Sequence, residues 1–184
     1  MRENYEKIQT PADNRRGFKT EYRYKGFWYA WDLDEAGLKR RRLLYLAAEL
    51  VSIAVYLAAA LQKTALNSAR ITAGLAALSL IPWIAELWGV FRFLTRKTPM
   101  PVSDYQEIRD FITVGSAVRV VLLVCAMAAG AVILAQAGRF TGRDLSALLG
   151  HLLSAAVSVL ILVLQGRLHC SMYENDHGKP GREL

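Results

Sequence analysis

The chain has 184 residues, of which 53% are hydrophobic and 21% are charged, and its formal net charge is +7. The charged residues avoid four long apolar runs, and this distribution excludes an ordinary soluble domain. It also excludes most enzymes that act on soluble substrates. The basic excess alone is compatible with nucleic acid, anionic lipid or membrane topology, so the positions of the basic residues must decide between them.

Residues 1–42 contain eleven of the 23 basic residues, and the last four of these adjoin the first apolar run. Such a basic cluster is typical of the cytoplasmic flank of a membrane span, because translocating it is costly. A nucleic-acid interface would need a folded basic surface separate from this flank, and the sequence indicates none, so we predict no nucleic-acid partner. We predict instead a cytoplasmic tail with an interfacial anchor formed by Trp28, Trp31, Arg40, Arg41 and Arg42.

Aromatic residues cluster between Tyr22 and Trp31, and rings with an apolar body and a polar edge favour the lipid headgroup layer. An interfacial anchor is therefore the favoured interpretation, and a docking surface for a cytosolic protein is the alternative. Asp32 with Glu35 predicts a helix that begins at about Leu33 and continues into the first span. The first twenty residues and the last dozen are predicted to be flexible tails.

The four apolar runs predict an all-α polytopic membrane protein. Each run reaches the roughly 20 residues that a helix needs to cross the hydrocarbon core. We predict an antiparallel up-down bundle within residues 43–170, followed by a cytoplasmic tail over residues 171–184. Pro82 removes a backbone donor and is expected to kink the second helix near its middle. The predicted spans are residues 43–61, 71–94, 111–135 and 145–168.

The loops agree with these spans. Ser103 with Gln106 forms a capping-box pattern just after Pro101, which predicts that the third helix begins outside the membrane. Thr141 with Asp144 is a weaker start signal of the same type for the fourth helix. Basic residues are frequent in the N-terminal tail, in or beside the loop between the second and third spans, and after the fourth span. They are scarce in the other two loops. We therefore predict a protein of the plasma or inner membrane with both termini in the cytoplasm.

Three ionisable residues stand out inside the predicted spans, where a charge is costly and each needs a partner or a functional role. Glu49, Glu86 and Arg119 lie at similar depths, roughly 8 to 12 Å from the cytoplasmic edge at 1.5 Å per residue. Their helical phase suggests that they face one another, since Glu49 shares one face of its helix with Tyr45 and with other polar residues. We predict that the three charges form an intramembrane polar cluster.

Two interpretations of this cluster compete. In the structural interpretation, Arg119 pairs with one or both carboxylates and fixes which helix faces which. In the functional interpretation, the second carboxylate binds a proton or a cation, and the kink at Pro82 gates access to it. Two acids with one base are not neutral unless one acid is protonated, and this favours the functional interpretation, in which the protein is a transporter. Four short spans seldom form a complete transporter alone, and this favours the structural interpretation.

The fourth span carries a second polar stripe. A lone histidine in such a stripe is expected to make a helix–helix hydrogen bond rather than to bind a metal. The two cysteines of the chain, Cys125 and Cys170, lie at different depths and should not form a disulfide. The stripe consists of His151, Ser154, Ser158 and Gln165.

The sequence contains no phosphate-binding glycine loop, zinc-protease signature, nucleophile elbow or paired-cysteine motif. We therefore predict no enzyme activity, no cofactor and no metal site. The favoured function is that of a subunit, assembly factor or regulator in a larger membrane complex, in contact with the lipid bilayer and with a membrane-protein partner or a second copy. The alternative is a small proton- or cation-coupled transport unit that uses Glu49, Glu86 and Arg119.

Overall fold

The computed structural model describes residues 5–11, 18–24, 26–138 and 141–174. This part of the chain is mostly helical and contains four helices long and apolar enough to cross a membrane. The described residues fall into two compact units. We call them the sheet unit, from residues 1–32, 96–106 and 169–184, and the helical unit, from residues 33–95 and 107–168.

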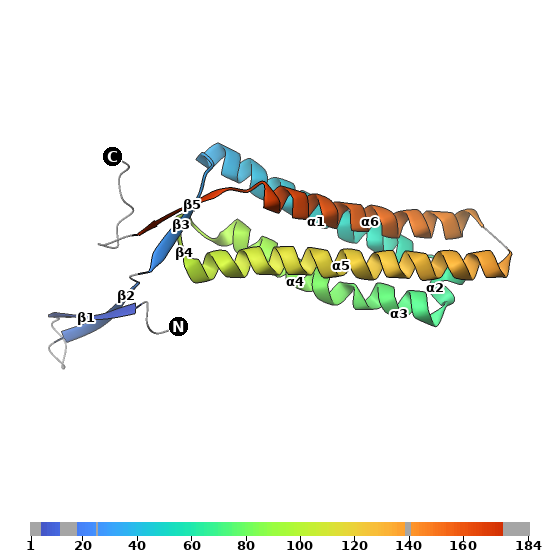
Figure 1. Ribbon diagram of the computed structural model, residues 1–184, viewed down its shortest axis with the longest axis horizontal. Coiled ribbons are helices and arrows are strands. Elements are labelled where there is room, and N and C mark those ends of the chain that lie inside the picture. The colour runs from blue at the N-terminus through green and yellow to red at the C-terminus, as the bar shows by residue number, and fades with distance from the viewer. Residues whose placement is uncertain (1–4, 12–17, 25, 139–140, 175–184) are drawn as a thin grey trace. The chain divides into compact units, whose positions relative to one another are not determined.

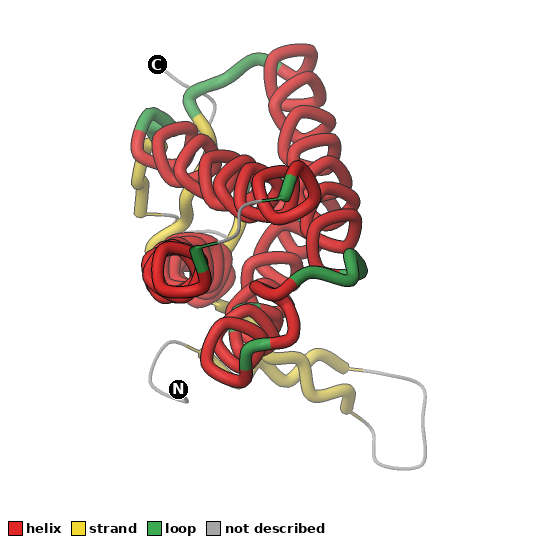
Figure 2. Tube along the Cα trace, turned by 90° about the vertical axis from the view of Figure 1, so that its right-hand side faces the viewer, coloured by secondary structure: helices red, strands yellow, loops and turns green. Residues whose placement is uncertain are grey.

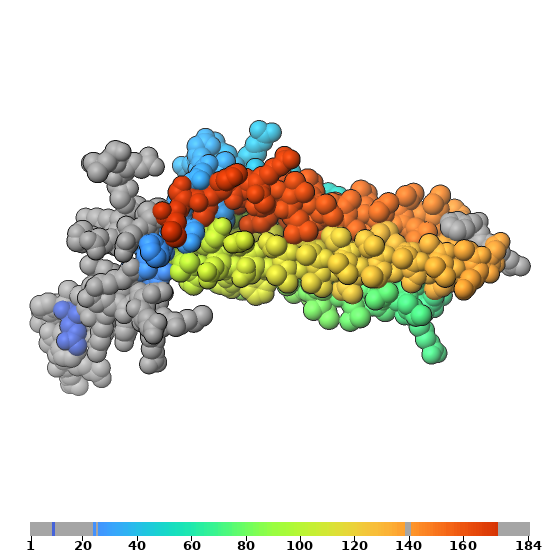
Figure 3. Space-filling model, viewed as in Figure 1, coloured from blue at the N-terminus to red at the C-terminus, as the bar shows by residue number. Residues whose placement is uncertain are grey.

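The helical unit contains the four apolar helices, which lie beside one another in Figures 1 and 2. In the space-filling view, α5 and α6 lie against each other along the unit (Figure 3). The predicted spans are confirmed as apolar helices, and each of the four begins before its apolar run does. The helices are α1 (Glu35–Ala60), α2 (Ala65–Ser68), α3 (Arg70–Leu78), α4 (Leu80–Thr95), α5 (Val102–Ala137) and α6 (Gly142–Gly166).

Local signals set the helix boundaries. Asp34 caps α1 by accepting a hydrogen bond from the Gly37 backbone N–H, which places the helix start close to the predicted position. Thr141 and Asp144 form a complete capping box at the start of α6, as the sequence predicts. Helix α5 begins at Val102, directly after Pro101, which also agrees with the prediction.

The second span is interrupted, whereas the sequence predicts one kinked helix over residues 71–94. Helix α3 ends at Leu78 and α4 begins at Leu80, with Ser79 between them. The interruption precedes Pro82 because a proline donates no hydrogen bond to the carbonyl four residues earlier. The Ser79 hydroxyl donates to the Ala76 carbonyl at 2.6 Å and so satisfies a backbone group near the break.

Polar and apolar residues are distributed in the opposite sense to a soluble protein. Large apolar side chains such as Leu50, Ile81 and Val121 are 60% or more exposed, whereas Glu86 and Arg119 are completely buried. In water, an apolar surface this extensive would be a strong aggregation hazard. Against lipid it is the surface expected of a span.

The sheet unit corrects the prediction of an all-α chain. Strand β3 (Phe27–Trp31) pairs antiparallel with β4 (Met100–Pro101) and with β5 (Cys170–Glu174). Strands β1 (Tyr5–Pro11) and β2 (Phe18–Tyr24) form a separate antiparallel pair. Strand β1 and the start of β2 fall in the first twenty residues, which the sequence predicts to be a flexible tail. Most of the predicted C-terminal flexible segment lies outside the described residues. The partners of β3 are distant in sequence, so no local pattern indicated the pairing.

The predicted anchor residues Trp28 and Trp31 both lie on β3. Trp31 is only 6% exposed and packs on the ring of Tyr105 at 5.4 Å between centroids, and Tyr29 stacks on the same ring at 4.4 Å. The aromatic cluster therefore supplies packing within the sheet unit, and its role at a lipid interface stays a prediction.

Both cysteines of the chain are free thiols, as expected. Burial in the sheet unit raises the pKa of the Cys170 thiol.

Candidate buried polar site

The central contact of the helical unit is the ion pair between Glu86 of α4 and Arg119 of α5. Both side chains are completely buried, and Nη1 of Arg119 lies 3.3 Å from Oε2 of Glu86. The other carboxylate oxygen, Oε1, accepts a hydrogen bond of 2.6 Å from the Ser116 hydroxyl. The Ser158 hydroxyl of α6 donates to Oε2 at 3.4 Å. Glu86 is thus satisfied by donors from two other helices.

Arg119 joins α5 to α6 as well as to α4. Its Nη2 donates to the Ser154 hydroxyl at 2.9 Å, and its Nη1 donates to the Ser158 hydroxyl at 3.3 Å. The guanidinium carbon also lies 5.9 Å from the centre of the Trp83 ring of α4. A planar guanidinium presents several donors in fixed directions, so this single side chain sets the relative positions of three helices.

Glu49 of α1 reaches the cluster by a different contact. It is 1% exposed, and its Oε2 accepts a hydrogen bond of 2.9 Å from the Trp83 indole nitrogen. Its Oε1 has no hydrogen-bond partner among the residues that the structure describes. The structure therefore brings the three predicted residues into one buried region, with Arg119 in contact with Glu86 rather than with Glu49.

Trp83 was not among the predicted site residues. The signal that indicates it is its position one turn before Glu86, on the same face of α4. An indole N–H is a donor without acceptor capacity, so a tryptophan on a polar face is a natural partner for a carboxylate.

The predicted stripe of α6 is buried along its whole length. The hydroxyls of Ser154 and Ser52 lie 3.1 Å apart, and the Gln165 amide oxygen accepts a hydrogen bond of 3.1 Å from the Tyr45 hydroxyl. Ser158, as described above, belongs to the Arg119 cluster. Three of the four stripe residues therefore make hydrogen bonds to another helix.

His151 differs from the prediction of a helix–helix hydrogen bond. Within the described residues neither ring nitrogen has a hydrogen-bond partner, although the side chain is 1% exposed. The ring instead packs edge-on against Tyr56 of α1, with centroids 5.5 Å apart. The Tyr56 hydroxyl donates its proton to the Ala76 carbonyl at 2.6 Å and so has none to donate to His151. Ala76 lies three residues before the break at Ser79, whose position the sequence did not locate.

The basic run lies in the first turns of α1. Arg40 is exposed, whereas Arg41 and Arg42 are half-buried, and the Arg42 guanidinium lies 5.6 Å from the centre of the Phe93 ring of α4. The interfacial role of this run stays a prediction.

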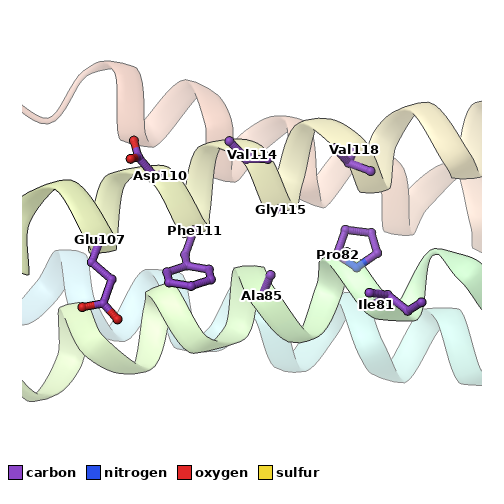
Figure 4. Close-up of a pocket in the computed structure, with 9 residues that line it drawn as sticks. All are labelled: Ile81, Pro82, Ala85, Glu107, Asp110, Phe111, Val114, Gly115 and Val118. Carbon is purple, nitrogen blue, oxygen red and sulfur yellow. The ribbon is translucent and has the colours of Figure 1, made fainter.

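An apolar groove of about 500 Å³ runs between α4 and α5 on the outer surface of the helical unit. Figure 4 shows Phe111 projecting from α5 toward α4 and, further along the groove, Pro82 projecting from α4 toward α5. The helices approach closely here because Gly115 has no side chain to separate them. Glu107 and Asp110 lie at one end of the groove, and Glu107 forms an ion pair with Arg92 of α4. A second apolar hollow of about 680 Å³ adjoins it along α4 and shares Ile81, Ala85 and Phe111.

The chain matches no family model, no curated protein and no solved structure. Its class therefore follows from the fold and the site: a mostly helical protein with four helices long and apolar enough to span a membrane, and with a buried ion pair between two of them.

Proposed function

We propose that this chain is an integral protein of the plasma or inner membrane and acts, without enzymatic activity, as a subunit, assembly factor or regulator of a larger membrane complex. In this proposal the four spans form an antiparallel up-down bundle, and both termini lie in the cytoplasm. The contacts between α1 and α6 support the antiparallel order. Positions 45, 52 and 62 of α1 bond to positions 165, 154 and 146 of α6, so the two helices run in opposite directions. The distribution of basic residues supports the orientation.

The observation that carries the subunit proposal is the apolar groove between α4 and α5. All of its lining except Glu107 and Asp110 lies within the predicted spans, so we assign its occupant as a transmembrane helix of a partner subunit. The exposed Asp110 at the predicted cytoplasmic end supports this assignment, because membrane helices carry basic residues on their cytoplasmic flank. Small residues such as Ala85 allow a second helix to approach closely.

Site-specific photocrosslinking in native membranes tests this groove. A photoreactive residue in place of Val114, which lines the groove and is 59% exposed, is expected to attach to one transmembrane peptide identified by mass spectrometry. The matched control replaces Val159 of α6, which is 43% exposed and lies outside the groove. Adducts with lipid alone at Val114, or the same protein adduct at both positions, would refute the proposed contact.

A second function, a proton- or cation-coupled transport unit, is favoured by one specific observation. Arg119 neutralises Glu86, and this leaves Glu49 as a second buried carboxylate with one oxygen unpartnered by any described residue. An ionised carboxylate in such a place is very costly, so Glu49 must hold a proton or a cation, or be reached by one. Of the two acids, Glu49 is therefore the proposed coupling residue.

Reconstituted vesicles test this second function. We expect Glu49→Gln to abolish proton or cation flux while the protein remains folded, because glutamine keeps the shape and the acceptor for Trp83 but binds no proton at neutral pH. Glu86→Gln is the contrasting variant, since it removes the charge that Arg119 contacts directly and should reduce folded yield. Flux that persists in folded Glu49→Gln protein would exclude Glu49 as the coupling site.

A further inference from the structure

Polar side chains follow the contact between α1 and α6 from one end of these helices to the other. At one end the Ser146 hydroxyl donates to the Gln62 amide oxygen at 2.7 Å, and at the other end Tyr45 bonds to Gln165. Between these ends lie the Tyr56–His151 contact and the Ser52–Ser154 hydroxyl pair. One turn from that pair come Glu49 on α1 and Ser158 on α6, and the Ser158 hydroxyl donates to Glu86. We call this series the α1–α6 polar column.

The column is long enough to cross most of a bilayer. From Tyr45 to Gln62 the chain advances by 17 residues, a distance of about 25 Å at 1.5 Å per residue. The hydrocarbon core is about 30 Å thick. Interhelical hydrogen bonds also hold membrane helices together, so the length of the column does not by itself indicate transport. The column is distinguished by the buried polar atoms in it that make no such bond to a described residue.

The unpartnered atoms of the column belong to its two protonatable groups. Glu49 Oε1 and both His151 ring nitrogens are buried and make no hydrogen bond within the described part of the chain. The two residues lie on either side of the Ser52–Ser154 pair, each one turn away along its own helix. In that hydroxyl pair either oxygen can be the donor, so the pair can reverse its direction.

We propose that the α1–α6 polar column is a transmembrane proton path in which Glu49 and His151 are the two proton-binding stations and Ser52 and Ser154 relay between them. This inference rests on the second function proposed above. It identifies the transported species as the proton, and it adds His151 and the two serines to the site.

The transfer needs no co-reactant. A protonated His151 releases the proton from a ring nitrogen to a bridging water, which passes another of its protons to the hydroxyl pair. Each hydroxyl accepts one proton on its oxygen and releases the one it carried, and a second bridging water carries the last to Glu49 Oε1. A single water closes a gap of one helical turn between polar groups. Charge is conserved at each transfer, and no bond other than O–H or N–H changes.

The groups that face the stations favour a proton over a metal cation. Glu49 faces Glu86 of α4, Arg119 of α5 and the Trp83 N–H, and His151 faces Tyr56 of α1. The Arg119 cation repels a metal ion, and the Trp83 N–H, a donor without acceptor capacity, offers it no ligand. Within the described residues no three His, Cys, Asp or Glu side chains are placed to hold a metal ion.

The experiment measures proton flux into vesicles that contain the full chain, driven by a potassium diffusion potential and detected by an entrapped pH dye. We expect Ser52→Ala and His151→Gln each to reduce the flux roughly a hundredfold, the size of effect typical for loss of a proton-transfer group. Ser68→Ala is the matched control, because its hydroxyl bonds to the Thr64 carbonyl away from the column and should leave flux unchanged. Each variant is compared only as folded, monodisperse protein.

The outcomes separate this inference from the function on which it rests. No proton flux in the unmodified protein would overturn both. Flux that Glu49→Gln abolishes but that folded Ser52→Ala and His151→Gln leave intact would overturn the path and keep Glu49 as the coupling site. If His151→Gln does not fold, the Ser52→Ala and Ser68→Ala comparison decides alone. In the unmodified protein, flux that is slower in heavy water and absent for Na⁺ supports the path, whereas flux of Na⁺ overturns it.

Discussion

Replacing Arg119 by leucine is expected to lower the free energy of unfolding by about 3–5 kcal/mol, the usual cost of removing one partner of a buried ion pair. The reason is the position of Glu86, which is completely buried and would lose its contact with the positive charge of Arg119. Ser154 would also lose the donor that Arg119 Nη2 supplies. Titration of the purified protein with a denaturing detergent, followed by tryptophan fluorescence or circular dichroism, measures the change.

The double variant Arg119→Leu with Glu86→Leu provides the control. Removal of both charges leaves no uncompensated ion, so we expect most of the lost stability to return. A matched single variant, Arg109→Leu, removes an exposed arginine of the same helix and should change stability by less than about 0.5 kcal/mol. Equal destabilisation by the single and the double change would show that the ion pair does not hold these helices together.

Alanine at Gly115 is expected to destabilise the helical unit by about 1–3 kcal/mol, the cost of overpacking a tight contact. A Cβ atom at this position would lie 2.7 Å from the Glu86 backbone nitrogen and 2.9 Å from the Pro82 carbonyl oxygen. Both are backbone atoms, so no rotamer change relieves the contact and α4 must move away from α5. The adjacent Ser116 would then be displaced from the Glu86 carboxylate, and the buried cluster would weaken with it.

Gly74 is the matched control for this prediction. It lies inside α3 and has no other group within 4 Å of an added Cβ. Gly74→Ala should therefore stabilise the protein by up to about 1 kcal/mol, because alanine has the higher helix propensity. Detergent titration of both variants tests the pair. If Gly115→Ala is as well tolerated as Gly74→Ala, the close approach of α4 and α5 is not required for folding.

Several features could be predicted from residues near each other in sequence. The apolar runs identified the four long helices, and the Thr141–Asp144 pattern identified the start of α6, because both signals depend on hydrophobicity and on hydrogen bonds within one turn. The burial of Glu49, Glu86 and Arg119 also follows from the sequence, since an ionisable side chain inside a span is forced away from lipid.

Other features depend on contacts between distant segments. The pairing of β3 with β5 joins residues more than 130 positions apart, and its strands are too short for an alternating pattern to distinguish them from an interfacial segment. The position of the break at Ser79 was missed because Pro82 indicates a disturbance without fixing its residue.

The sequence by itself determined that four apolar helices enclose a small set of charges, because hydropathy and helical periodicity are local properties of the chain. The tertiary structure decided that Arg119 contacts Glu86, that Trp83 holds Glu49, and that His151 packs on Tyr56 without a hydrogen bond. These choices depend on the rotation and register of one helix against another. That geometry is set by close contacts such as the one at Gly115, which no periodic pattern records.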